Sequence, residues 1–273
     1  WGTAVAVGAG DGLNISTDGD PKFKEPYQQY DAINQVMPKG GDLGQIEPVE
    51  FSPEFGSKIG LPYTPGSLGS AIAALFGTIV TPALISPSTT VYKHVFKWAD
   101  YMTNFFTYVT TRPGVIWEVP ACVVQKLSLK VGSGYIQGSI GLVGNTLKDD
   151  SSVNTVTQTA AITPESMGPF VKFQQGVLRM NTASGAGLAS GDSLVVSDLT
   201  MDFERTVTKQ QVLGGTYMVQ PYEQNFKITL KVTLPYATAA NMAYLDTFKA
   251  LTAQKMDIVF TGALADANCA VSS

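Results

Sequence analysis

The chain has one histidine in 273 residues, and this scarcity limits the chemistry that it can perform. A histidine-dependent mechanism or metal site would have to use His94, which shares one side of an alternating run with three aromatic residues. We therefore expect a structural histidine, either in the core or at an interface. The spacings of a serine-hydrolase elbow, a zinc-protease helix, a C-x-x-C pair and a phosphate-binding loop are also missing. No catalytic, cofactor-binding or metal-ligating residue is predicted, and we expect the chain not to be an enzyme.

Charge is the second scarce property. Only 15% of the residues are charged, whereas about 25% is usual in soluble domains, so we expect part of the surface to be hidden in an oligomer. The net charge is −4, which gives no basic field to hold nucleic acid. No apolar run reaches the roughly 18 residues of a membrane span, and the start lacks the basic region of a signal peptide. We therefore expect neither a DNA-binding module nor a membrane protein.

Cysteine is scarce as well. Cys122 and Cys269 lie far apart, and two cysteines are too few for a disulfide framework. A single disulfide and two reduced thiols are both compatible with the sequence, and reduced thiols are favoured for a protein that folds in a cytoplasm.

What the chain has in abundance is alternation of apolar and polar residues, the period of a β-strand. The clearest runs are 89–99, 123–131, 198–204 and 226–234. In the last run, the residues expected to face the core are Phe226, Ile228, Leu230, Val232 and Leu234. One buried face and one wet face per strand are typical of antiparallel sheets.

Two segments predict helices. Thr64 can cap the first, with Pro65 at its first position and Gly77 at its end. Its expected core stripe consists of Leu68, Ile72, Leu75 and Phe76. The second helix is predicted over about 238–250, with Met242, Leu245 and Phe248 facing inward. The expected fold is mainly β, an antiparallel β-sandwich or open barrel with one or two packed helices.

Three long stretches show no clear period: 40–63, 144–169 and 207–224. Loops longer than about 12–15 residues are usually functional or disordered. We expect a single domain over 1–273 whose long extended loops reach neighbouring subunits.

Several segments together resemble the major tail tube proteins of long-tailed bacteriophages. They follow in the same order along most of the chain, and each by itself is weak. The segments are the opening WGTAVAVG, the helix PGSLGSAIAALFG at 65–77, the strand YKHVFKWAD at 92–100, Glu118 with the strand pair 126–130 and 138–144, and the late strand, loop and strand at 198–205, 212–215 and 227–235.

The resemblance implies a structural virion protein that self-assembles. Such proteins form a β-sandwich with a packed helix and associate as six-fold rings, which stack into a hollow tube that delivers phage DNA. The implied partners are other copies of the chain and the tape measure, terminator and tail-tip proteins. DNA would pass through the lumen without specific binding. The chain would be made in the host cytoplasm and reside in the phage tail.

A DNA conduit should have a neutral or acidic wall without a cluster of lysine or arginine, because basic surfaces bind the phosphate backbone. The strand 198–204 places Asp198, Asp202 and Glu204 on one face. This face is the candidate lumen wall. The alternative is that it lies outside the tube and aids solubility.

Three other functions remain compatible with the sequence. One is the tube subunit of a contractile tail or secretion system, which shares the same chemistry. Another is a β-sandwich that binds carbohydrate or a receptor, which predicts exposed loop aromatics; in the late loop only Tyr217 and Tyr222 qualify. The third is a hydrolase built on the acidic strand face, since paired carboxylates can serve glycoside hydrolysis.

Overall fold

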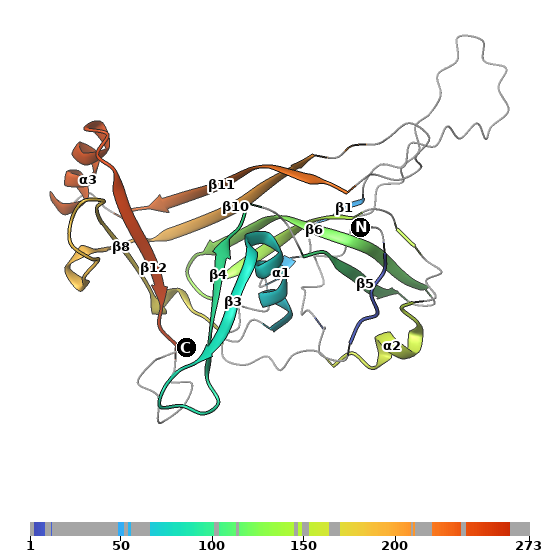
Figure 1. The fold of residues 1–273 in the computed structure, drawn as a ribbon. Helices are drawn as coiled ribbons and strands as arrows, with labels where there is room; N and C mark the ends of the chain where they lie inside the picture. The colour runs from blue at the N-terminus through green and yellow to red at the C-terminus, as the bar shows by residue number, and fades with distance from the viewer. Residues whose placement is uncertain are drawn as a thin grey trace, which may run out of the picture.

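The protein is mainly β, as predicted, and its sheets are antiparallel and not closed into a barrel (Figure 1). The structure is a computed structural model. It describes residues 3–8, 12, 49–51, 54–55, 66–100, 104–112, 115–144, 147–148, 153–163, 170–208, 210, 220–235 and 239–262.

A large sheet forms the centre of the molecule, with strand order β1-β7-β6-β10-β11. Two further strands attach to it, β2 beside β7 and β5 beside β6. The strands are β1 (Val49–Phe51), β2 (Glu54–Phe55), β5 (Phe106–Arg112), β6 (Val115–Val131), β7 (Gln137–Gly144), β10 (Asp198–Thr208) and β11 (Tyr222–Thr233).

Two smaller sheets accompany the central one. The hairpin consists of β3 (Gly77–Leu84) and β4 (Tyr92–Trp98). The three-stranded sheet has the order β12-β8-β9. Its strands are β8 (Gly176–Thr182), β9 (Ser193–Leu194) and β12 (Gln254–Phe260), and the short 3₁₀ turns η1 (Phe173–Gln175) and η2 (Ser190–Asp192) precede β8 and β9.

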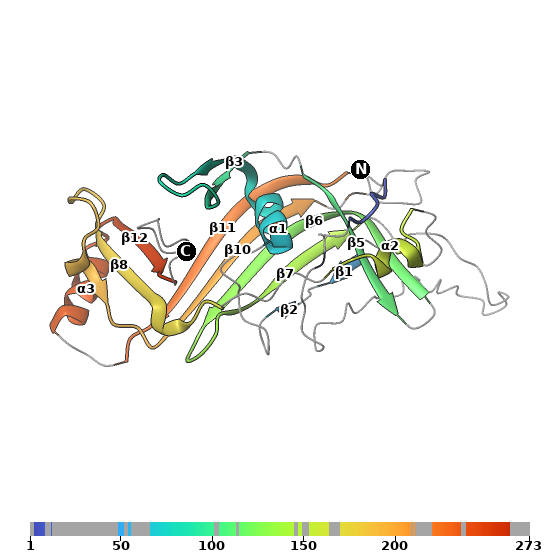
Figure 2. The same cartoon turned by 90° about the horizontal axis from the view of Figure 1, so that it is seen from below.

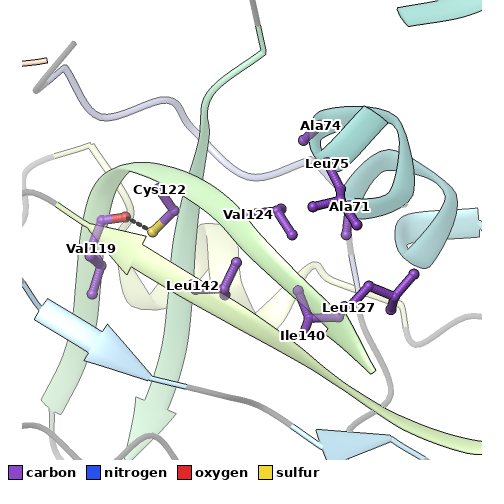
Figure 3. Close-up of a cluster of buried hydrophobic side chains, with 9 residues drawn as sticks. All are labelled: Ala71, Ala74, Leu75, Val119, Cys122, Val124, Leu127, Ile140 and Leu142. Carbon is purple, nitrogen blue, oxygen red and sulfur yellow. Dashed lines mark hydrogen bonds between the residues drawn. The ribbon is translucent and has the colours of Figure 1, made fainter. Parts of the chain in front are cut away.

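The first predicted helix is α1 (Gly66–Phe76), which lies across one face of the central sheet (Figure 2). Leu75 is fully buried, and Ile72 and Phe76 pack against the same cluster; the side chain of Leu68 lies outside the described residues. Gly77 ends the helix with a φ of +89°, which suits glycine because it has no Cβ. Figure 3 shows how α1 meets β6 and β7 through Ala71, Ala74, Leu75, Val119, Cys122, Val124, Leu127, Ile140 and Leu142.

The three-stranded sheet covers the same face of the central sheet further along. Ile258 and Phe260 of β12 pack against a second buried cluster that contains Val131 and Leu199. One side of the central sheet is therefore covered twice, by α1 and by the small sheet. This arrangement makes two layers around a shared core.

Two predictions about burial were wrong. The apolar residues of β11 share the covered side of the sheet, and Leu230 packs against a buried cluster. Ile228, however, is 58% exposed, and Val232 and Leu234, the latter just after the strand, are also exposed. The second predicted helix exists as α3 (Ala239–Lys249), but Met242 and Phe248 are exposed rather than inward-facing. The side chain of Leu245 lies outside the described residues.

The three long stretches contain some regular structure. The stretch 40–63 contributes β1 and β2, which pair with β7 of the same chain. Within 144–169 lie the helix α2 (Val156–Ala160) and a β-bridge between Lys148 and Glu118. The stretch 207–224 overlaps the end of β10 and the start of β11. Contact of these stretches with other subunits stays a prediction.

Candidate assembly surfaces

The three acidic residues of the candidate lumen wall lie on the side of the central sheet opposite α1 and the small sheet, which no described helix or sheet covers. Along β10 they alternate with Leu199 and Phe203, which belong to or pack against the buried clusters. Asp202 accepts a hydrogen bond from Ser128 Oγ at 2.5 Å, Glu204 is exposed and Asp198 is half-buried. The acids thus share one face with each other and not with the core.

Lysines from both neighbouring strands flank these acids. Lys126 of β6 and Lys227 of β11 stand opposite Glu204. Four residues along β10, Lys130 and Lys231 stand opposite Thr200 in the same way. With four lysines and three carboxylates, this part of the face carries alternating charge and a small positive excess. The acidic face that the sequence suggested is therefore only its central strand.

Arg205 is a fully buried cation on the covered side of the sheet. Its Nη2 donates hydrogen bonds to the carbonyl oxygens of Phe76, 3.2 Å away, and Ala99, 3.1 Å away. The guanidinium carbon lies 4.0 Å from the centre of the Trp98 ring. Arg205 thereby joins the end of α1 and the end of β4 to the central sheet, and a cation near a helix C-terminus is favourable.

An aromatic cluster surrounds this arginine. The ring centres of Trp98 and Phe226 are 4.1 Å apart, and Phe76 lies 5.6 Å from Phe203. The sequence analysis did not single out Arg205, although the period of the strand places it on the same side as Phe203. An arginine at an apolar position of an alternating strand is the signal that would have found it.

A second buried polar group holds the N-terminal segment 3–8. Asn154 donates to Glu118 Oε2 at 2.5 Å and to the carbonyl of Val5 at 3.1 Å, and it accepts from the amide of Val7 at 2.8 Å. The amide of Val5 also donates to Thr107 Oγ1 on β5. These bonds fix the segment against β5 and the turn that precedes α2.

The described residues contain no group of three or more potential metal ligands, and none of the described helices has the length and apolar character to cross a membrane. The hydrogen bonds of Arg205 and Asn154 hold separate parts of the chain together.

The comparison with protein families decides the identity. The family described as phage tail tube protein matches residues 40–272. The chain belongs to this family. A search of curated proteins finds no match. Membership in the phage tail tube family assigns a structural role in the tail tube, self-assembly into that tube with other tail proteins, and a place in the virion.

In this tail tube family member, His94 lies on β4 and is exposed. His94 therefore does not lie in the core of a single subunit, and its role at an interface stays a prediction. The hairpin β3–β4 around it also exposes Leu84, Tyr92 and Trp98.

The cysteine of the core is unavailable for surface chemistry. Cys122 is fully buried and free, and its Sγ lies 3.3 Å from the carbonyl oxygen of Val119 (Figure 3). Burial raises the pKa of its thiol to about 12, because the charged thiolate is poorly solvated there. Cys269 lies outside the described residues.

Proposed function

We propose that this chain forms six-fold rings that stack into the hollow tail tube, and that the uncovered face of the central sheet lines the lumen through which DNA passes. The observation that carries the proposal is the open central sheet in a member of the tail tube family. Among the described strands, β11 pairs only with β10. An exposed edge of this length would template aggregation unless another strand or subunit covered it.

Ring closure would cover the exposed side chains of β11. Ile228 is 58% exposed and Val232 37% exposed, although both occupy apolar positions of the strand. A neighbouring subunit that pairs with β11 would bury these side chains and would also form hydrogen bonds with the backbone of this edge strand. Sheets joined in this way would form one wall around a channel.

The layer arrangement supports the choice of lumen face. α1 and the small sheet cover one side of the central sheet. The opposite side, with Asp198, Asp202 and Glu204, has no cover from the described helices and sheets and is the one suited to a water-filled channel. Paired strand positions stand about 4.5–5.5 Å apart, well inside the Debye length of about 8 Å at physiological salt. Each Glu204 with its flanking Lys126 and Lys227 therefore presents short-range alternating charge to DNA. The four lysines depart from the neutral or acidic wall expected of a conduit. The carboxylates of Asp202 and Glu204 beside them would interrupt the attraction, so DNA would slide without specific binding.

The remaining parts of the proposal concern partners. The rings would contact each other and the tape measure, terminator and tail-tip proteins, with His94 and the stretches 40–63, 144–169 and 207–224 at contacts between subunits. The chain would be made in the host cytoplasm and would act in the virion.

Assembly tests the proposal directly. The purified chain should form rings or tubes in negative-stain images. Ile228→Asp combined with Val232→Asp should leave a folded monomer that forms neither, because the charges would be buried at the β11 edge. Val195→Asp, between β9 and β10, is the matched control, since Val195 is 58% exposed, as Ile228 is, and lies outside the proposed contact stretches. A chain that stays monomeric at every concentration, or tubes formed by the double variant, would contradict the proposal.

The lumen assignment has its own test. Glu204→Lys would put a lysine between Lys126 and Lys227, so that three lysines would stand in one row across the face. Tubes should form normally, but DNA ejection should slow, and more so at low salt. Asp246→Lys on the exposed surface of α3 is the control. Ejection that is unchanged at all salt concentrations would place this face outside the tube.

A further inference from the structure

Four lysines form two pairs on the side of the central sheet opposite α1. β10 lies between β6 and β11 (Figure 2), and each pair has one lysine on each of these two outer strands. Adjacent strands lie about 4.8 Å apart, and a strand rises about 3.3 Å per residue. The lysines of a pair are therefore about 10 Å apart across β10, and the two pairs are about 13 Å apart along it. We call these four residues the lysine frame: Lys126, Lys130, Lys227 and Lys231.

The carboxylates inside the lysine frame do not pair with its ammonium groups. Within the described part of the chain, none of the four lysines forms an ion pair with an oxygen within 4.0 Å. Asp202 instead accepts a hydrogen bond from Ser128, and Glu204 is exposed between the lysines of one pair. The four lysine side chains are exposed as well. Their charges are therefore open to a partner from outside the chain.

The side chains around the lysine frame favour an anion over a protein surface as that partner. Ser139 of β7 stands beside Ser128 of β6, and Gln137 stands beside a lysine of the frame. Thr229 stands between the two lysines of β11. Hydroxyl and amide groups donate hydrogen bonds to phosphate oxygens, as lysine does. Protein–protein contacts usually centre on apolar or aromatic side chains, and the described positions that pair with the frame carry none.

We propose that the lysine frame contacts the phosphates of duplex DNA that passes over this face, without reading the base sequence. Duplex DNA carries one negative charge per about 1.7 Å of its axis, so about seven phosphates lie along the roughly 13 Å of the frame at one time. Four ammonium groups then always have phosphates within reach, whichever base pairs are passing. The proposal rests on the proposed function, since it names the residues by which the lumen wall would touch DNA.

Glu204 keeps this contact weak. A lysine that meets a phosphate releases the counterions condensed on DNA, and this release drives binding. The carboxylate of Glu204 repels the same phosphates from its place between two lysines. Attraction and repulsion thus act within one row of side chains, so removing a positive or a negative charge there should change the affinity for DNA in opposite directions.

Salt-dependent binding of a short labelled DNA duplex tests the contact. The unassembled chain is isolated by gel filtration, and fluorescence anisotropy is followed from about 20 to 200 mM salt. Four phosphate contacts should give a slope of about −3.6 for the logarithm of the affinity against the logarithm of the salt concentration. Lys126→Gln with Lys227→Gln should reduce the slope to about −1.8, and Glu204→Gln should tighten binding.

Two lysines of another strand provide the matched control. Lys93→Gln with Lys97→Gln also removes two exposed lysines from a single element, β4, and should leave the slope unchanged. A duplex of scrambled sequence should bind as the first duplex does. All these variants should melt at the temperature of the unchanged chain, because the substituted side chains are exposed.

Three results would overturn the proposal. The first is no duplex binding at about 20 mM salt, and the second is a loss of slope in the β4 control as large as in the frame variant. The third is binding of a polyglutamate peptide without binding of the duplex, which would indicate an acidic protein partner instead. Because the unassembled chain is used, these results count against the lysine frame alone. A chain that never forms rings or tubes would instead contradict the proposed function, whether or not it binds the duplex.

Discussion

Replacing Arg205 by alanine should destabilise the chain strongly. The change removes two hydrogen bonds from a charged donor, to the carbonyls of Phe76 and Ala99, at about 1.5–3 kcal/mol each. It also removes the stacking on Trp98, which is about 2 kcal/mol for a desolvated cation. Against these losses, the alanine variant no longer has the cost of burying a guanidinium, which is several kcal/mol. The expected net loss in the free energy of unfolding is about 3–5 kcal/mol.

Chemical and thermal unfolding measure this loss. At about 2–4 °C per kcal/mol for a chain near this size, the melting temperature should fall by about 6–20 °C. Arg205→Lys should recover only part of the loss, because an ammonium lacks the planar fork that reaches two carbonyls and stacks on a ring. Arg179→Ala is the matched control: it removes a half-buried ion pair with Asp257 and should cost less. A loss of under about 1 kcal/mol for Arg205→Ala, or one no larger than the control's, would refute the assignment of Arg205 as the residue that joins α1 and β4 to the sheet.

Two further predictions concern the core around α1. Leu75→Ala should lower the free energy of unfolding by about 2–5 kcal/mol in urea titrations, since Leu75 is fully buried and the change leaves a cavity; a loss below about 1 kcal/mol would contradict its place in the core. In a Cys269→Ser background, Cys122 should resist iodoacetamide at pH 8, because a thiol with a pKa of about 12 leaves roughly one molecule in 10⁴ ionised. The stability that the protonated Cys122 thiol contributes should be fully present below its unfolded pKa near 9 and should be lost as the pH rises toward 12. Labelling of the native protein at the rate of a free thiol would exclude the burial of Cys122.

Local sequence determined the elements because their periods are local. The spacing of apolar residues around Leu75 and the stop at Gly77 were enough to predict α1, which spans 66–76. The alternation through 198–204 and 226–234 was enough to predict β10 and β11. Elements of these kinds predicted a mainly β, antiparallel fold. The motifs predicted membership of the tail tube family, which the family match confirms.

The surfaces could not be predicted in the same way. A period states which residues share a face, but only strand order and packing state what covers that face. Lys126 and Lys227 flank Glu204 because β6 and β11 both pair with β10, and no local pattern specifies that order.

The same reason explains the exposed apolar residues. In the periodic pattern, Phe248 looks as suited to a core as Leu75 does. The tertiary structure places a sheet against α1 and leaves α3 at the end of the molecule. Sequence alone therefore determined the elements and the family, whereas the cover over each face depended on contacts between residues far apart in the chain.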